Sequence, residues 1–209
     1  DDQLLNTTNG DTTWLPVDGL TAWQTYTFTV SAADALGNTT AETLTATVQT
    51  PDTTLPLWIE GSTLTVLDTT PHTVTLTWSA PTDNVAIETL RLYRDNVLIT
   101  TLTAADAQFI DTGLSPWTQY TYRIDALDVA QNVAANSPTL TVKTPDENAP
   151  QWPIKGTVTA TNIQPTSLTL SWSQATDDVS VVQYQVLQNG QELATVNPVI
   201  QTLDVLDLS

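Results

Sequence analysis

Strict alternation of apolar residues with threonine is the feature that most limits what this chain can fold into. In TVTLTW at 73–78, Val74, Leu76 and Trp78 fall on one side and three threonines on the other. Successive side chains of a strand point to opposite faces, so this pattern predicts a strand with one buried face. Three more segments share it, with expected inward residues Tyr26, Phe28, Val30 and Ala32; Tyr120, Tyr122, Ile124 and Ala126; and Leu168, Leu170 and Trp172. No window shows helical spacing, so we predict an all-β chain.

The sequence also repeats itself. TPDTTLPLW at 50–58 returns as TPDENAPQW at 144–152, and the strand patterns between them recur on both sides. Laid in order, these segments divide the chain into one complete module, residues 51–145, between two halves. Residues 1–50 repeat only the second half of that module, and residues 146–209 repeat only its first half.

Two corners carry a family resemblance. The run LSPWTQY at 114–120 resembles the corner before the sixth strand of fibronectin type III domains, and LTAWQTY at 20–26 repeats it with Ala22 in place of the proline. TDNVAIETLRLYRDN and DALDVAQNVAANS resemble the bacterial branch of that family. The resemblance implies tandem immunoglobulin-like sandwiches. It also implies that Tyr120 and Tyr26 bond back to the preceding loop, and that Trp78 and Trp172 lie in the core.

Composition narrows the function. Five lysines and arginines stand against 23 acidic residues, a formal charge of -18. This charge repels phosphate backbones and anionic lipid surfaces, so no nucleic acid partner and no membrane insertion are expected. The acidity suits bound cations or an extracellular, saline medium. We therefore expect an extracellular or cell-surface protein, with any export signal outside these residues.

Acidic residues recur where the resemblance brings loops together. In the family, the amino-terminal linker shares a pole with the loop after the second strand and the loop before the last. Three or four acids on converging loops could hold calcium, which takes 6 to 8 oxygens. DENAP also resembles the calcium-binding linker of cadherins. The alternative is that these residues only make turns by bonding their own backbone. The candidates are Asp52, Asp83 and Asp128 for the complete module, and Asp146, Glu147, Asp177 and Asp178 for the trailing module, with Asp34 added if the leading half completes it.

Proline and tryptophan mark the joints. Proline fixes φ and favours an extended preceding residue, which predicts semi-rigid linkers. Trp23 and Trp117 lie in the corners that close one module, and Trp58 and Trp152 open the next, so the pairs are candidates for interdomain packing. Alternatively, each ring covers the end of its own core, or stacks on carbohydrate.

Catalytic patterns are missing from the sequence. His72 is the single histidine, cysteine is absent, and no zinc, nucleophile or phosphate-binding motif occurs. We expect His72 in a surface loop, no enzyme activity and no cofactor other than calcium. Asn6 and Asn38 begin NTT and match the N-glycosylation acceptor pattern.

These observations predict an extracellular structural repeat, a spacer or a filament segment. The halves either come from a longer tandem array, or complete each other head to tail between copies, or close the chain on itself. Two other classes remain open: an accessory spacer module of a secreted polysaccharide-degrading enzyme, and an adhesin that binds a surface protein or glycan.

Overall fold

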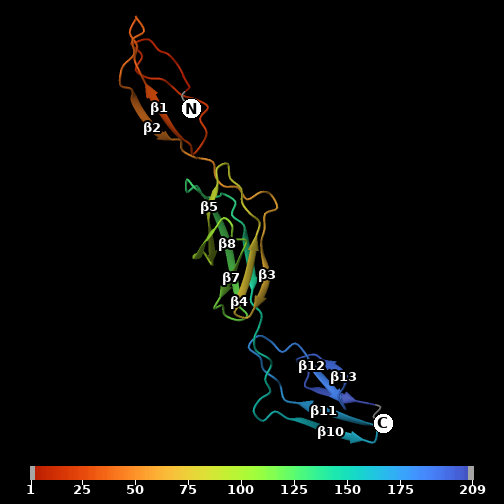
Figure 1. Ribbon diagram of the computed structural model, residues 1–209. Helices are drawn as coiled ribbons and strands as arrows, with labels where there is room; N and C mark the ends of the chain where they lie inside the picture. The colour runs from red at the N-terminus through yellow and green to blue at the C-terminus, as the bar shows by residue number, and fades with distance from the viewer. Residues whose placement is uncertain (1–2, 207–209) are drawn as a thin grey trace. The chain divides into compact units, whose positions relative to one another are not determined.

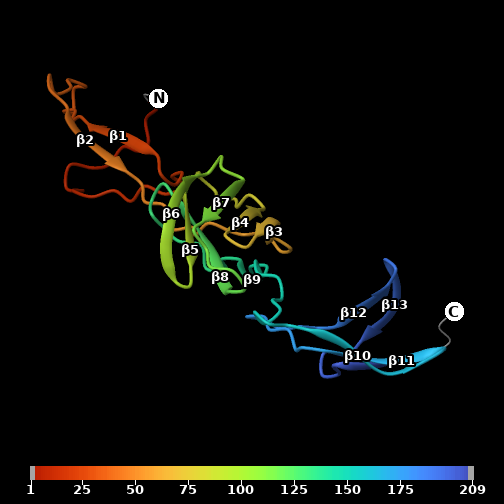
Figure 2. The same cartoon turned by 90° about the horizontal axis from the view of Figure 1, so that it is seen from below.

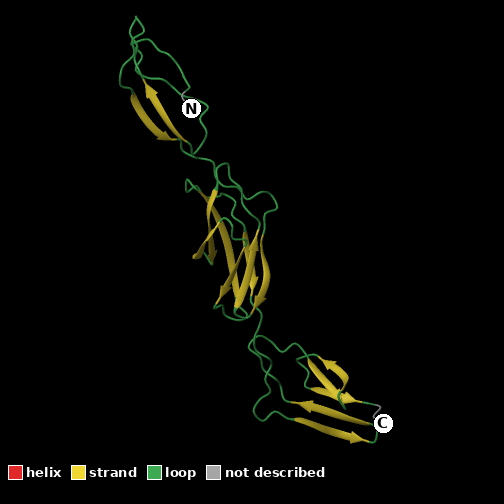
Figure 3. Ribbon diagram, in the orientation of Figure 1, coloured by secondary structure: helices red, strands yellow, loops and turns green. Residues whose placement is uncertain are grey.

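The computed structural model describes residues 3–206, and within them every regular element is a β-strand (Figure 3). The all-β prediction is thus confirmed. Within residues 3–206, no helix is long and apolar enough to cross a bilayer.

The central part holds seven strands in two antiparallel layers (Figures 1 and 2). One sheet has the order β3-β4-β7 and the other the order β6-β5-β8-β9. In the second sheet Leu90 lies opposite Ala126, and Leu92 opposite Ile124. The strands are β3 (Leu64–Thr70), β4 (Thr73–Trp78), β5 (Ile87–Arg94), β6 (Val97–Thr103), β7 (Gln108–Thr112), β8 (Gln119–Asp128) and β9 (Thr139–Lys143).

The core of this sandwich follows the alternation in the sequence. Val74 and Leu76 of β4 are fully buried and Trp78 nearly so, while the threonines between them are half-buried. On β8, Tyr122, Ile124 and Ala126 are likewise buried. The Trp78 ring donates from Nε1 to the Asp106 carbonyl at 3.0 Å, which satisfies its one polar atom. Trp78 therefore lies in the core of this sandwich.

The leading part has one two-stranded sheet of β1 (Thr25–Val30) and β2 (Leu44–Gln49). Tyr26 is half-buried, stacks on Phe28 at 6.2 Å, and accepts a hydrogen bond at its hydroxyl from the Thr21 amide at 2.9 Å. The predicted tyrosine corner therefore forms here even without proline. The prediction that Val30 and Ala32 face inward is wrong, because no second sheet covers this face among the described residues, and Val30 is 65% exposed.

The trailing part has two sheets, of order β10-β11-β14 and β12-β13. Its small core is built on Ala175, Tyr184 and Val196. Trp172 packs against it in an edge-to-face contact with Tyr184, with the two ring centroids 5.6 Å apart. Leu168 and Leu170, expected inward, are only half-buried because few strands cover them. The strands are β10 (Val158–Gln164), β11 (Ser167–Trp172), β12 (Tyr184–Gln188), β13 (Gln191–Val196) and β14 (Thr202–Val205).

Candidate functional site

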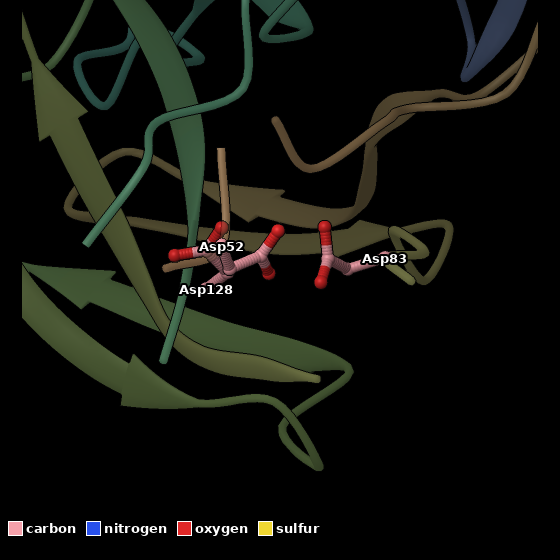
Figure 4. A group of neighbouring side chains, drawn as sticks. All are labelled: Asp52, Asp83 and Asp128. Atoms are coloured by element: carbon pink, nitrogen blue, oxygen red, sulfur yellow. The ribbon is translucent and has the colours of Figure 1, made fainter. Parts of the chain in front are cut away.

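Three carboxylates from distant parts of the sequence meet at one end of the central part. Asp52 comes from the linker before β3, Asp83 from the loop after β4, and Asp128 ends β8. One oxygen of each lies within 4.8 Å of the others, and Figure 4 shows the three side chains gathered together. The structure thus brings together the three residues that the family resemblance placed at this pole.

Backbone pairing fixes the linker against the loop after β4. Leu57 and Thr82 exchange two amide-to-carbonyl hydrogen bonds, of 2.8 and 2.9 Å. Gln151 and Thr176 form the same pair of bonds, with the same lengths, in the trailing part. The repeat in the sequence therefore reproduces the scaffold that positions the acids.

In two of the carboxylates, one oxygen accepts a hydrogen bond and the other has no hydrogen-bond partner. Asp52 Oδ1 accepts from the Thr54 amide at 3.1 Å, and Asp83 Oδ2 accepts from the Val85 amide at 2.9 Å, so each makes a turn with its own backbone. The other oxygens, Asp52 Oδ2 and Asp83 Oδ1, are buried and have no hydrogen-bond partner. Turn formation therefore explains one oxygen of each residue, but it does not explain the buried second oxygen.

Two asparagines complete the site, and the sequence analysis missed both as site residues. Asn84 donates from Nδ2 to Asp52 Oδ1 at 3.3 Å. Asn132 donates its backbone amide to Asp128 Oδ1 and its Nδ2 to Asp128 Oδ2, both at 2.8 Å. Its Nδ2 also lies 3.1 Å from the Asp52 carbonyl oxygen. The spacing Asp-x-x-x-Asn, which occurs at Asp34 and again at Asp128, was the available signal.

A second acidic group lies in the trailing part. Single oxygens of Asp146, Asp177 and Asp178 lie within 4.8 Å of one another, beside a depression of about 430 Å³. Asp177 is half-buried and Asp178 exposed, so this group is more open to solvent than the first. Asp34 lies instead in the leading part, where its Oδ1 and Oδ2 each accept from Asn38 at 2.8 Å.

The Glu147 side chain contacts His72 and is not part of this second acidic group. Its Oε2 lies 3.0 Å from Nε2 of His72, whose Nδ1 lies 2.8 Å from the Leu114 carbonyl oxygen. The Leu114 carbonyl is the main cause, and Glu147 the second, of a His72 pKa raised above its usual value. His72 lies in the turn between β3 and β4 with 52% of its side chain exposed, so the expected surface position is confirmed.

The four linker and corner tryptophans differ in their surroundings. Trp58 is 1% exposed, and Trp152, its counterpart in the repeat, is 59% exposed and stacks on Tyr184 at 5.8 Å. Trp23 and Trp117 both have positive φ, of 55° and 50°, and Lys143 Nζ lies 3.2 Å from the centroid of the Trp117 ring. Packing of these rings across the joints stays a prediction.

The remaining predicted residues are the two candidate glycosylation asparagines and the corner tyrosine Tyr120. Asn6 and Asn38 are exposed, but Nδ2 of Asn38, the atom that a glycan would occupy, donates to Asp34. Tyr120 is half-buried and lies under the Arg94 guanidinium, 5.6 Å from the ring centroid.

Comparison with known proteins identifies the central part. Residues 61–143 match the family described as fibronectin type III domain. These residues form a fibronectin type III domain. Domains of this family are typically non-catalytic modules, and the match lies inside the predicted module of residues 51–145.

Relatives of the fibronectin type III domain and its flanking parts are much longer proteins. Exoglucanase B of Cellulomonas fimi is 38% identical over 171 residues, which are 76% of this chain and 15% of the relative. Chitinase A1 of Niallia circulans is 38% identical over 136 residues, 63% of this chain and 19% of the relative. The central fibronectin-III array of RIM-binding protein, a solved structure, is 20% identical with a TM-score of 0.36, over 71% of this chain and 57% of that one. The chain thus spans less than a fifth of the two curated relatives.

Proposed function

We propose that this chain is an accessory spacer of a secreted, extracellular polysaccharide-degrading enzyme, and is not itself catalytic. The observation that carries the proposal is the similarity, at 38% identity, to segments of both an exoglucanase and a chitinase. Two enzymes named for different polysaccharides share this segment, so it does not decide the substrate. A module that spaces a catalytic unit from a binding unit can serve enzymes that act on different polysaccharides.

Local features of the chain support a spacing role. Pro51 and Pro56 in one linker, and Pro145 and Pro150 in the other, fix φ and keep the chain extended around the acidic residues. The net charge of -18 disfavours collapse of one module onto its acidic neighbour. The proposal replaces a surface filament as the preferred function, because the relatives are named as enzymes.

The test begins with the gene that encodes this chain. Reading outward from both ends, we expect a catalytic module that hydrolyses polysaccharides in the same polypeptide. In the full protein, replacement of residues 1–209 by a short Gly/Ser linker should lower the rate on insoluble cellulose or chitin several-fold. The rate on a soluble oligosaccharide should stay unchanged, because the catalytic module itself is untouched.

Two results would contradict the spacer proposal. One is a gene without any hydrolase module, and the other is equal loss of activity on soluble and insoluble substrates. Retention of the purified chain on cellulose or chitin would instead favour the glycan-binding alternative. End-to-end strings in electron micrographs would favour head-to-tail partnership between copies, in which the leading and trailing parts complete each other.

A further inference from the structure

Two of the three residues in the acidic group at this end of the central part, Asp52 and Asp128, are buried to an unusual degree for their charge. Asp128 has no exposed surface and Asp52 is 5% exposed. Asp52 Oδ2 and Asp83 Oδ1 are shielded from water and accept no hydrogen bond. Buried polar atoms almost always have a partner, so each of these two oxygens needs an explanation.

The hydrogen bonds to the three carboxylates do not neutralise them. The donors are the backbone amides of Thr54, Val85 and Asn132 and the side-chain amides of Asn84 and Asn132, all of them neutral. Three negative charges with oxygens within 4.8 Å of one another repel strongly, and buried charge is costly unless it is paired. A bound cation supplies the missing positive charge and the missing partners at once.

The spacing of the oxygens fits a calcium ion. Calcium binds oxygen at about 2.3 to 2.6 Å, so two ligands on opposite sides of one ion lie about 5 Å apart. The three oxygens, all within 4.8 Å of one another, can share a single ion of this size. Magnesium needs near-ideal octahedral geometry at about 2.0 to 2.1 Å and keeps most of its water, so it fits such an irregular, buried group less well.

We propose that Asp52, Asp83 and Asp128 bind one calcium ion in the fibronectin type III domain. Asp52 supplies Oδ2, Asp83 supplies Oδ1, and Asp128 supplies an oxygen that still has a free lone pair, with water completing the 6 to 8 oxygens. Asn132 is a positioning residue, since it holds both oxygens of Asp128 and the Asp52 carbonyl.

Burial of whole residues separates this group from the acidic group of the trailing part: Asp52 is 5% exposed and Asp128 has no exposed surface, whereas Asp177 is half-buried and Asp178 is exposed. Many acids here make turns at the surface, as Asp34 does in the leading part, and such turns need no ion. At Asp52 and Asp83 the turn uses one oxygen and the fold encloses the other. Closing a carboxylate oxygen away from water without a donor indicates a ligand that is not part of the chain.

The test measures thermal unfolding of the whole chain in chelator and in 5 mM CaCl₂ or MgCl₂ at equal ionic strength. Unfolding is followed by hydrogen exchange in β4 and β8, which belong to the fibronectin type III domain. Calcium should raise the midpoint of this domain by several degrees, and magnesium should raise it much less. Asp83→Asn should abolish the calcium shift, whereas Asp68→Asn, an equal charge change on the exposed side of β3, should keep it.

The chelator arm separates loss of a ligand from loss of the fold. Without calcium, Asp83→Asn should melt no lower than the natural chain, because it removes one of three repelling charges. Calorimetric titration should give a dissociation constant at least tenfold weaker in Asp83→Asn than in Asp68→Asn. The proposal is overturned if calcium leaves the natural midpoint unchanged, or if Asp83→Asn and Asp52→Asn both keep the full shift.

Discussion

Asn132 donates hydrogen bonds to both carboxylate oxygens of Asp128, from its backbone amide to Oδ1 and from its side-chain Nδ2 to Oδ2, each at 2.8 Å. Asn38 binds Asp34 through the same two bonds with the same lengths. Asp34 is exposed and Asp128 fully buried, so burial does not create this geometry. The five-residue loop from the aspartate to the asparagine forms this pair of hydrogen bonds locally. In the fibronectin type III domain, the Asp128 carboxylate is in addition buried next to Asp52.

Removing the Asn132 side chain should destabilise the fibronectin type III domain. In Asn132→Ala, Asp128 Oδ2 and the Asp52 carbonyl lose the same donor. We expect a loss of about 1 to 3 kcal/mol in the free energy of unfolding, the usual cost of a buried acceptor left unsatisfied. Urea unfolding in chelator, followed by hydrogen exchange in β4 and β8, measures it. Asn38→Ala is the matched control and should leave this transition unchanged; an equal effect would refute the role of burial.

The counterpart tryptophans should respond very differently to truncation. Trp58 is 1% exposed, so Trp58→Ala should cost about 3 to 5 kcal/mol through lost burial and a cavity. Trp152 is 59% exposed and stacks on Tyr184, so Trp152→Ala should cost about 1 kcal/mol in the trailing part. Hydrogen exchange in β4 reports the first and exchange in β11 the second. Similar losses at both sites would mean that Trp152 is buried at a joint in solution.

The sequence predicts the fold better than it predicts the site. Alternation alone places Val74 and Leu76 correctly, because a strand in a closed sandwich buries every second residue. It fails at Val30, where the strand pattern is intact but no second sheet lies over it among the described residues. Periodicity says which residues share a face, and not whether anything covers that face.

For the site, the family resemblance predicts the positions of the loops but not the directions of the side chains. The family resemblance brings Asp52, Asp83 and Asp128 together, since loop positions follow from topology. It does not tell which way a neighbouring side chain points, and Glu147, adjacent to Asp146 in the linker, turns away to His72. Charge does not single out Asn132, because its amide is neutral, although this amide orders Asp128 and contacts the Asp52 carbonyl.

Backbone strain at the corner should appear when Trp117 is replaced. Its φ of 50° lies in the left-handed region, which glycine adopts freely and alanine does not. Both Trp117→Gly and Trp117→Ala lose the ring and its contact with Lys143, so the difference between them isolates the backbone. The glycine variant should be more stable than the alanine variant by about 1 kcal/mol in urea unfolding. Equal stability, or a more stable alanine variant, would show that the corner relaxes.

The single histidine should report its contacts through its titration. The Leu114 carbonyl accepts from Nδ1, so a neutral ring would turn the bare Nε2 lone pair toward the Glu147 carboxylate, and both contacts favour the protonated form. The pKa of His72 is therefore raised in the folded chain. A raised folded pKa gives stability that is fully present below the unfolded value of about 6.5 and is lost as pH rises through the folded pKa.

An NMR titration of the imidazole, the only one in the chain, should give a pKa above 6.5. Glu147→Gln should lower this pKa but leave it above the usual value, because Leu114 is the larger cause. Glu60→Gln, an exposed control, should not change it, and a His72 pKa at or below 6.5 in the natural chain would contradict both contacts.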